Sequence, residues 1–272
     1  MNMFDKLETE LKIRGFSQKT VDSYKLYNEQ FLKFINKEPE KIEENDIKNY
    51  LNYLTSNKHY KPRSLNLALS SLKFFYNNVM NKKITENIKS PKLDKKVPVI
   101  LNNEEIKLLL NAITNQKHKI LISLMLSSGL RISEAVSVKI SDINFEEKTL
   151  KVKHGKENKE RTTIVSGKLL EDIKIYLAKR KDSNPYLFSI RDSHVTIKLP
   201  QKIIKGAAKK ANLNKKIHCH ALRSTFANNL MSNGVSNRYI KTLLGHNNSG
   251  SEIYAKASLE EIKKIKNPLD NL

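Results

Sequence analysis

The segment from His218 to Tyr254 holds more chemically active side chains than a buried helical segment requires. It contains three of the chain's 7 histidines, together with Arg223, Arg238 and a terminal tyrosine, all mixed into helical apolar spacing. His220 and Arg223 stand three residues apart, which places both side chains on one face of a helix. An arginine beside an imidazole suits an anionic oxygen. Taken alone, His220 fits a buried histidine satisfied by the backbone equally well.

The end of the same segment adds His246 and Tyr254. Gly245 is expected to end a helix in a left-handed turn, from which His246 projects. Tyr254 follows the polar stretch NNSGSE and could reach an external substrate. A phenol with a pKa of about 10 becomes a nucleophile when cationic neighbours favour the phenolate. A single tyrosine more often packs its ring on a core, and Tyr239 is a nearby rival, although it lies inside the helical pattern NRYIKTLL.

Two earlier motifs carry further candidates. SSGLRISEAVSV places Glu134 three residues after Arg131, so the carboxylate can hold the guanidinium while its fork binds a phosphate. HGKENKER places Lys156 at the tip of an expected hairpin, where a lysine can contact a phosphate or protonate a leaving oxygen. Nearby cations would lower the pKa of that lysine. Taken alone, the first motif fits a surface ion pair and the second a solvated turn, in which Lys159 is an equal candidate.

The sequence does not indicate a metal or a cofactor. The adjacent residues His218, Cys219 and His220 cannot converge on one ion, and no CxxC or HxxxH pattern supports such a site. There is no Walker loop and no acidic cluster placed to hold Mg²⁺. If phosphodiesters are cut, side chains must supply both the positive charge and the nucleophile. That combination points to transesterification through a phosphotyrosine, and we expect no cofactor.

The charge balance favours a polyanionic partner. The 272 residues include 50 Lys and Arg against 28 Asp and Glu, for a net charge of +22. The excess is shared, with 19 basic against 12 acidic residues in 1–97 and 31 against 16 in 98–272. Counterion release would drive binding to nucleic acid, and we rank this above a general solubility surplus. The single cysteine and the lack of a long apolar run predict a cytoplasmic protein without a membrane segment.

The elements that must position these residues are predicted to be mostly helices, because apolar residues recur at helical spacing along most of the chain. We expect a domain of four short helices in residues 1–85, with an aromatic stripe in the second helix as core. The charged stretch NIKSPKLDKKVPVI indicates an exposed linker over residues 86–100. A second domain, residues 101–272, would hold helices and one change of period, where TLKVKH and RTTIV predict two strands. The expected fold class is mainly α with a small β-hairpin (α+β).

Taken in order, the pieces GLRISE, HGKENKER, HALRSTFA and LLGH and the late tyrosine resemble the tyrosine recombinases of the phage integrase family. The size and the helical first half are most similar to the Xer recombinases, and the resemblance covers essentially the whole chain. It implies that Arg131 and Arg223 bind the scissile phosphate, that His220 and His246 assist, and that Glu134 supports the site.

The resemblance also implies the roles of the two remaining catalytic residues. Lys156 matches the hairpin lysine, the general acid for the 5′-hydroxyl leaving group, and Tyr254 matches the nucleophile that forms a 3′-phosphotyrosine bond. Two positions depart from the Xer pattern. Ser224 stands where a histidine is usual, and the gap from His246 to Tyr254 is one residue shorter, which bears on the pose of the tyrosine segment.

For the assembly, the resemblance implies two domains that form a C-shaped clamp around double-stranded DNA. We expect a monomer in solution and a homo-tetramer on two recombination sites, with room for a second recombinase as partner. The C-terminal helix, with Leu259, Ile262 and Ile265 on one edge, would dock on a neighbouring subunit or on its own domain. Integration, chromosome-dimer resolution and plasmid resolution are not distinguished. The alternatives are a DNA-binding architectural protein with a degenerate site and a type IB-like enzyme that relaxes supercoils.

Overall fold

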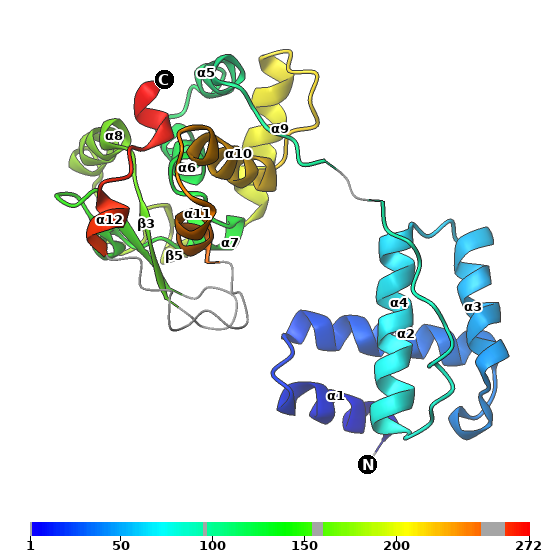
Figure 1. Ribbon diagram of the computed structural model, residues 1–272. Coiled ribbons are helices and arrows are strands. Elements are labelled where there is room, and N and C mark those ends of the chain that lie inside the picture. Colours follow the sequence, from blue (N-terminus) through cyan, green and yellow to red (C-terminus); the bar gives the residue numbers. More distant parts are fainter. Residues whose placement is uncertain (1, 95–96, 154–159, 246–258) are drawn as a thin grey trace. The chain divides into compact units, whose positions relative to one another are not determined.

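The computed structural model describes residues 2–94, 97–153, 160–245 and 259–272 (Figure 1). The chain divides into two compact units, Met1–Lys96 and Val97–Leu272. Each unit has its own cluster of buried apolar side chains. Helices dominate both units and the strands are short, so the expected mainly α fold with a small sheet is confirmed.

The first unit is a bundle of four α-helices. Their bounds are α1 Met3–Ile13, α2 Gln18–Ile35, α3 Glu44–Ser56 and α4 Pro62–Phe74, with a 3₁₀ turn η1 at Pro39–Lys41 and a π turn η2 at Phe75–Val79. The aromatic stripe of α2 is core at Phe31, which is fully buried against Tyr50 and Tyr76, whereas Phe34 at its end is 39 % exposed. Helix α4 begins at Pro62, whose fixed φ suits the first helical position.

The chain remains attached to the first unit beyond residue 85. Ile88 is buried in that unit's core, and its carbonyl accepts a hydrogen bond from Lys73 Nζ at 2.7 Å. The second unit holds the chain from Leu101, whose backbone N–H donates to Thr225 Oγ1 at 3.0 Å.

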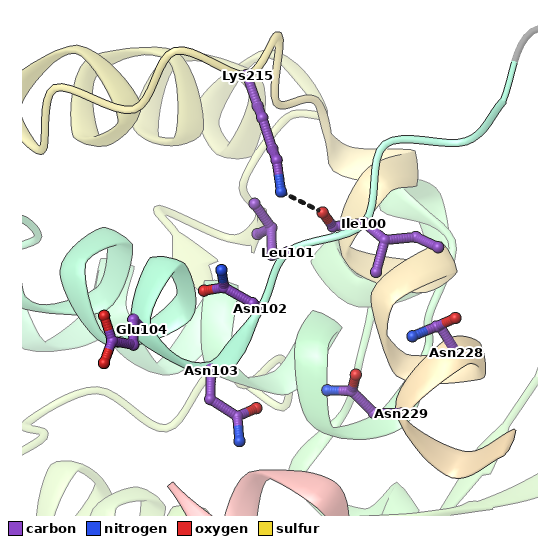
Figure 2. A pocket seen from close by; sticks show the side chains of 8 residues that line it. All are labelled: Ile100, Leu101, Asn102, Asn103, Glu104, Lys215, Asn228 and Asn229. Atoms are coloured by element: carbon purple, nitrogen blue, oxygen red, sulfur yellow. Dashed lines mark hydrogen bonds between the residues drawn. The ribbon is translucent and has the colours of Figure 1, made fainter. Parts of the chain in front are cut away.

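A surface pocket lies in the second unit beside Ile100 and Leu101 (Figure 2). Lys215 Nζ closes one side by donating to the carbonyl of Ile100 at 2.9 Å, and Asn228 and Asn229 line the other side. None of the residues that line this pocket is a candidate for the chemistry predicted above.

One helix, α6 (Gln116–Ser128), forms the centre of the second unit (Figure 1). Residues 120–128 are all buried, because α6 is covered by α8 (Gly167–Ala178), α9 (Lys198–Lys210) and α10 (Cys219–Ser232). Helix α5 (Asn103–Asn111) packs against α6 and α9, and α11 (Asn237–Leu244) packs against α10.

Gly129 ends α6 in the left-handed conformation, with φ of +60°. A Cβ at this position would lie 2.4 Å from Phe226 Cδ1, so the close packing of α10 also requires glycine. The polypeptide then turns at once into the short helix α7 (Ile132–Val136).

A three-stranded antiparallel sheet lies beside these helices, in the order β1 (Ile143–Asn144), β2 (Thr149–Val152), β3 (Arg161–Ile164). Strands β2 and β3 are the two expected from the sequence, and Val152 pairs with Arg161 where they meet the hairpin. The pair β4 (Ser189–Ile190) and β5 (Ser193–His194), the turn η3 (Ile140–Asp142) and β1 were not expected. Strands of two residues are too short to show alternation in a sequence.

The C-terminal segment packs on its own unit. It comprises α12 (Leu259–Lys263) and a 3₁₀ turn η5 (Pro268–Asn271). Ile262 is buried with apolar side chains of β3, α10 and α11, and Asn267 Nδ2 donates to the carbonyl of Ser127 at 2.8 Å. None of the helices in the described ranges combines the length and apolar composition needed to cross a bilayer.

Candidate active site

Three arginines from different elements surround the carboxylate of Glu134 in the second unit. Glu134 lies on α7 and its side chain is only 2 % exposed. Its oxygens accept hydrogen bonds from Arg131 Nη1 at 2.9 Å, Arg161 Nη1 at 2.8 Å and Arg161 Nη2 at 2.7 Å. Arg223 Nη1 lies 4.0 Å from Oε2. Three positively charged guanidinium groups therefore surround one carboxylate, and the cluster has an excess of positive charge.

The electrostatics of the cluster keep Glu134 ionised. Burial opposes the charged form, but the hydrogen bonds and the charge of Arg161, with the bonds from Arg131, outweigh it and lower the pKa of Glu134 to about 2. Burial and the positive charges of Arg131 and Arg161 lower the pKa of Arg223 to about 10. With these shifts Glu134 is ionised and Arg223 is protonated at neutral pH, so the cluster keeps its excess of positive charge.

Arg131 is the arginine that remains open to solvent. It is the N-cap of α7, and its backbone N–H donates to Glu134 Oε2 at 2.7 Å. Its side chain is 31 % exposed, compared with 4 % for Arg223. Among the described residues, Glu134 is the only hydrogen-bond partner of its guanidinium. The remaining donors of Arg131 can therefore bind an anion that approaches from outside.

Arg223 is held by the ends of two helices. It lies on α10, and it donates from Nη1 to the carbonyl of Gly129 at 2.7 Å and from Nη2 to the carbonyl of Leu244 at 2.6 Å. These carbonyls lie at the C-termini of α6 and α11, where the helix dipole favours a cation. The buried guanidinium is thus fixed in position before any ligand binds.

His220 lies one turn before Arg223 on the same helix, and its residue surface is exposed. Desolvation of the ring by the surrounding protein, followed by the positive charge of Arg223, lowers the pKa of His220 below its ordinary value of 6.5. The imidazole is therefore neutral at pH 7 and can accept a proton.

Lys156, His246 and Tyr254 lie outside the described residues. The described residues that flank them are held by the same cluster. Arg161 is the first residue of β3 and follows the segment that contains Lys156. Gly245, the residue before His246, is the left-handed C-cap of α11, as expected, with φ of +64°.

Arg161 is a member of the cluster that the sequence analysis missed. Its motif, HGKENKER, drew attention to the lysines, and the arginine was counted only as the first residue of a strand. Alternation places Arg161 on the same face of β3 as Thr163, but only the structure shows that this face is buried at Thr163. A charged residue on that inward face requires a buried partner, and Glu134 is that partner.

Tyr239, the rival to Tyr254, is placed unfavourably for attack. Its hydroxyl donates a hydrogen bond to the carboxylate of Glu261, and this hydrogen bond raises the pKa of Tyr239 above its usual value.

In the described part of the chain, no group of three or more His, Cys, Asp or Glu side chains is arranged to hold a metal ion.

Two family descriptions match this chain. The phage integrase family matches residues 100–261, and the phage integrase N-terminal SAM-like domain matches residues 3–86. The tyrosine recombinase XerA of Pyrococcus horikoshii is 33 % identical over 268 residues, which cover 97 % of this chain and 92 % of the relative. The tyrosine recombinase XerC of Caldanaerobacter subterraneus is also 33 % identical, over 85 % of this chain and 70 % of the relative.

Solved structures share the architecture. A crystal structure of XerA recombinase is 29 % identical and covers 96 % of this chain and 95 % of that chain, with a TM-score of 0.52. A lambda integrase dimer bound to a core site is 20 % identical over 92 % of this chain and 96 % of that chain, with a TM-score of 0.74. At 20 % identity the second likeness supports the fold alone.

Proposed function

Because this chain belongs to the phage integrase family and is a tyrosine recombinase similar to the Xer proteins, we propose that it exchanges DNA strands through a covalent 3′-phosphotyrosine intermediate formed by Tyr254. The observation that carries the proposal is the cluster of Arg131, Arg161 and Arg223 around one carboxylate. Its excess positive charge and the exposed donors of Arg131 suit a phosphodiester.

In this mechanism Arg131 and Arg223 bind the non-bridging oxygens of the scissile phosphate. Negative charge grows on these oxygens in the pentavalent transition state, and the preorganised donors of the two arginines stabilise that charge. Removal of one such donor costs about 3–4 kcal/mol of transition-state stabilisation. Glu134 supports the site by fixing Arg131, and His246 assists at the phosphate.

The cleavage step exchanges one bond to phosphorus for another. The phenolic oxygen of Tyr254 forms a bond to phosphorus as the bond to the 5′ oxygen breaks. Lys156 donates a proton to the departing 5′ oxygen, and the neutral imidazole of His220 takes the phenolic proton. In the second step a 5′-hydroxyl from a partner duplex attacks the phosphotyrosine as the bond between phosphorus and the phenolic oxygen breaks. The proton of the hydroxyl passes to Lys156, and His220 returns its proton to the phenolic oxygen, so that both the DNA and the tyrosine are restored.

The proposed partner is double-stranded DNA at a specific site. We assign DNA binding by a helical domain to residues 1–85, the connection to residues 86–100, and catalysis to residues 101–272, so that the two domains form a C-shaped clamp on the duplex. A homo-tetramer on two sites, assembled from monomers in the cytoplasm, completes the proposal, and a second recombinase can replace some subunits. In that assembly the segment that contains Ile262 and Ile265 leaves its own unit and docks on a neighbour.

The test begins with the DNA site. Covalent adducts are trapped with SDS on genomic fragments from the source organism, and the attached ends are sequenced. A duplex of that sequence, nicked beside the scissile phosphate so that a short fragment is lost, then accumulates adduct. Tyr254→Phe should bind this duplex but form no SDS-stable adduct, because the nucleophilic oxygen is missing, whereas Tyr239→Phe should form it.

The other outcomes separate the alternatives. If the wild-type protein binds DNA but traps no adduct, it is a DNA-binding protein with a degenerate site. If it forms the adduct and relaxes supercoiled plasmid, but never yields exchanged products from two sites, it is a relaxing enzyme. An adduct that persists in Tyr254→Phe moves the nucleophile to another residue.

A further inference from the structure

All three guanidinium nitrogens of Arg161 donate hydrogen bonds to groups of the protein. The side chain is 7 % exposed, and Nη1 and Nη2 donate to the two oxygens of Glu134 at 2.8 and 2.7 Å. The third nitrogen, Nε, donates to the carbonyl of Leu243 at 2.9 Å. With every nitrogen engaged, Arg161 has no open face toward a substrate, so its contribution passes through the residues that it contacts.

Those contacts reach both phosphate-binding arginines. Glu134, which Arg161 grips by a bidentate pair, also accepts a hydrogen bond from Arg131. Leu243, which Arg161 binds by its carbonyl, precedes Leu244, whose carbonyl accepts from Arg223. Arg161 therefore fixes the carboxylate that orients Arg131, and it also anchors the end of α11 that holds Arg223.

A plain structural ion pair does not account for the cluster. One arginine is enough to neutralise a buried carboxylate, yet three converge on Glu134. The extra cations repel one another, which is why Arg131 and Arg161 contribute to lowering the pKa of Arg223. Such an arrangement is unfavourable for the free protein and becomes favourable when an anion binds. The arginines beyond the first are therefore suited to binding an anion, in addition to the pair that stabilises the buried carboxylate.

We propose that Arg161 is a positioning residue for strand cleavage. It holds the Glu134 carboxylate so that Arg131 presents its donors to the non-bridging oxygens of the scissile phosphate, and it does not touch the DNA. This inference rests on the proposed function, since it needs a phosphodiester between Arg131 and Arg223.

Arg161→Lys tests the proposal, because a lysine keeps the charge but cannot grip both oxygens of Glu134 and the carbonyl of Leu243 at once. Adduct formation on the nicked duplex should fall about 100-fold, as for a reacting group displaced by about 1 Å. DNA binding, measured by mobility shift, should stay within about threefold, because phosphate contacts outside the scissile position supply most of the affinity.

Arg180→Lys is the matched control. The Arg180 side chain is 5 % exposed, pairs with Asp182 and donates to the carbonyls of Asn184 and Tyr186, but it belongs to a different cluster of the same unit. Its replacement should change the adduct rate no more than about threefold, since it removes an equally buried arginine without touching Glu134.

A substrate with a neutral methylphosphonate at the scissile position distinguishes positioning from general damage. Replacing a non-bridging oxygen by methyl removes the negative charge that Arg131 is proposed to bind. The adduct rate of Arg161→Lys should therefore fall less, relative to wild type, on this substrate. We expect the ratio of its rate to the wild-type rate to be about tenfold higher than on the phosphodiester, in keeping with the loss of an oxyanion donor.

The outcomes are distinct. An equal loss on both substrates would mean that Arg161 only stabilises the fold. A loss restored instead by a 5′-bridging phosphorothiolate would place the effect on Lys156. An unchanged adduct rate in Arg161→Lys would also overturn the proposal. If wild-type protein traps no adduct on any duplex, it is the proposed function that fails.

Discussion

The Cα of Gly245 lies directly against the side chain of Arg161. A Cβ at this position would lie 2.8 Å from Cδ and 3.3 Å from Nε of Arg161. Gly245 also has a φ of +64°, which side chains with a Cβ rarely adopt. The glycine therefore serves two purposes, since it ends α11 before His246 and leaves room for the arginine that grips Glu134.

Gly245→Ala should slow cleavage. The left-handed backbone costs about 1–2 kcal/mol of stability for a residue with a Cβ. In addition, the new methyl group would displace Arg161 and with it Glu134 and Arg131. We expect adduct formation on the nicked duplex to fall by at least about tenfold, because small displacements of catalytic groups lower the rate strongly. DNA binding should be retained.

Gly234→Ala is the control for the backbone effect. Gly234 has a φ of +79°, but no atom lies within 4 Å of a Cβ built there. The two variants should therefore lose similar stability in thermal unfolding, and only Gly245→Ala should lose cleavage. Equal cleavage by both variants would show that contact between residue 245 and Arg161 has no catalytic consequence.

Lys156→Ala should abolish the protonation of the leaving group. We expect the adduct rate to fall about 10²–10⁴-fold, as for loss of a general acid. A 5′-bridging phosphorothiolate should restore it, because a thiolate leaves without a proton. Lys159→Ala, the other lysine of the hairpin motif, should cleave the normal substrate at the wild-type rate. If the sulfur substrate rescues Lys159→Ala and not Lys156→Ala, the acid is Lys159.

Glu134→Gln should change the response of the second unit to acid. The pKa of Glu134 is lowered in the folded state from 4.5 to about 2, so the ionised carboxylate stabilises the fold above pH 4.5. That stability, about 3 kcal/mol, is lost as the pH falls from 4.5 toward 2. The difference in unfolding free energy between wild type and variant should shrink over this window, as measured by hydrogen exchange of α6 peptides in urea.

Glu171→Gln provides the comparison for that measurement. Glu171 lies on α8 with its side chain 66 % exposed and pairs with Lys174, so its replacement should leave the acid response of the unit unchanged. If the stability difference for Glu134→Gln is the same at pH 6 and at pH 2, the carboxylate is not held ionised by the arginines.

The C-terminal segment shows how assembly can depend on a contact within one subunit. Asp270 accepts hydrogen bonds from the hydroxyl of Ser166 and from the backbone N–H groups of Gly167 and Lys168, at the N-terminus of α8. An anion at a helix N-terminus is favourable, so the segment is secured on its own unit. Docking on a neighbour, as proposed for the tetramer, first requires release of these bonds.

Local spacing was enough to predict most of the elements and part of the site. Gly245 was expected as a left-handed helix end and has a φ of +64°. The pair Arg131 and Glu134 was expected from its spacing of three residues, and the two nitrogen–oxygen hydrogen bonds are present. Helix ends and neighbours three residues apart depend on interactions within one turn, and those are visible in a sequence.

Only the tertiary structure decided how the site is held together. Arg161 and Glu134 are 27 residues apart, and Arg223 lies 94 residues from Gly129, whose carbonyl it binds. Such contacts are set by the packing of β3, α7 and α10 around α6, which no periodicity encodes. The sequence alone therefore determined which residue types were available for phosphate chemistry. The fold decided that a third arginine joins them, because the packing of β3 brings Arg161 to Glu134 across 27 residues of chain.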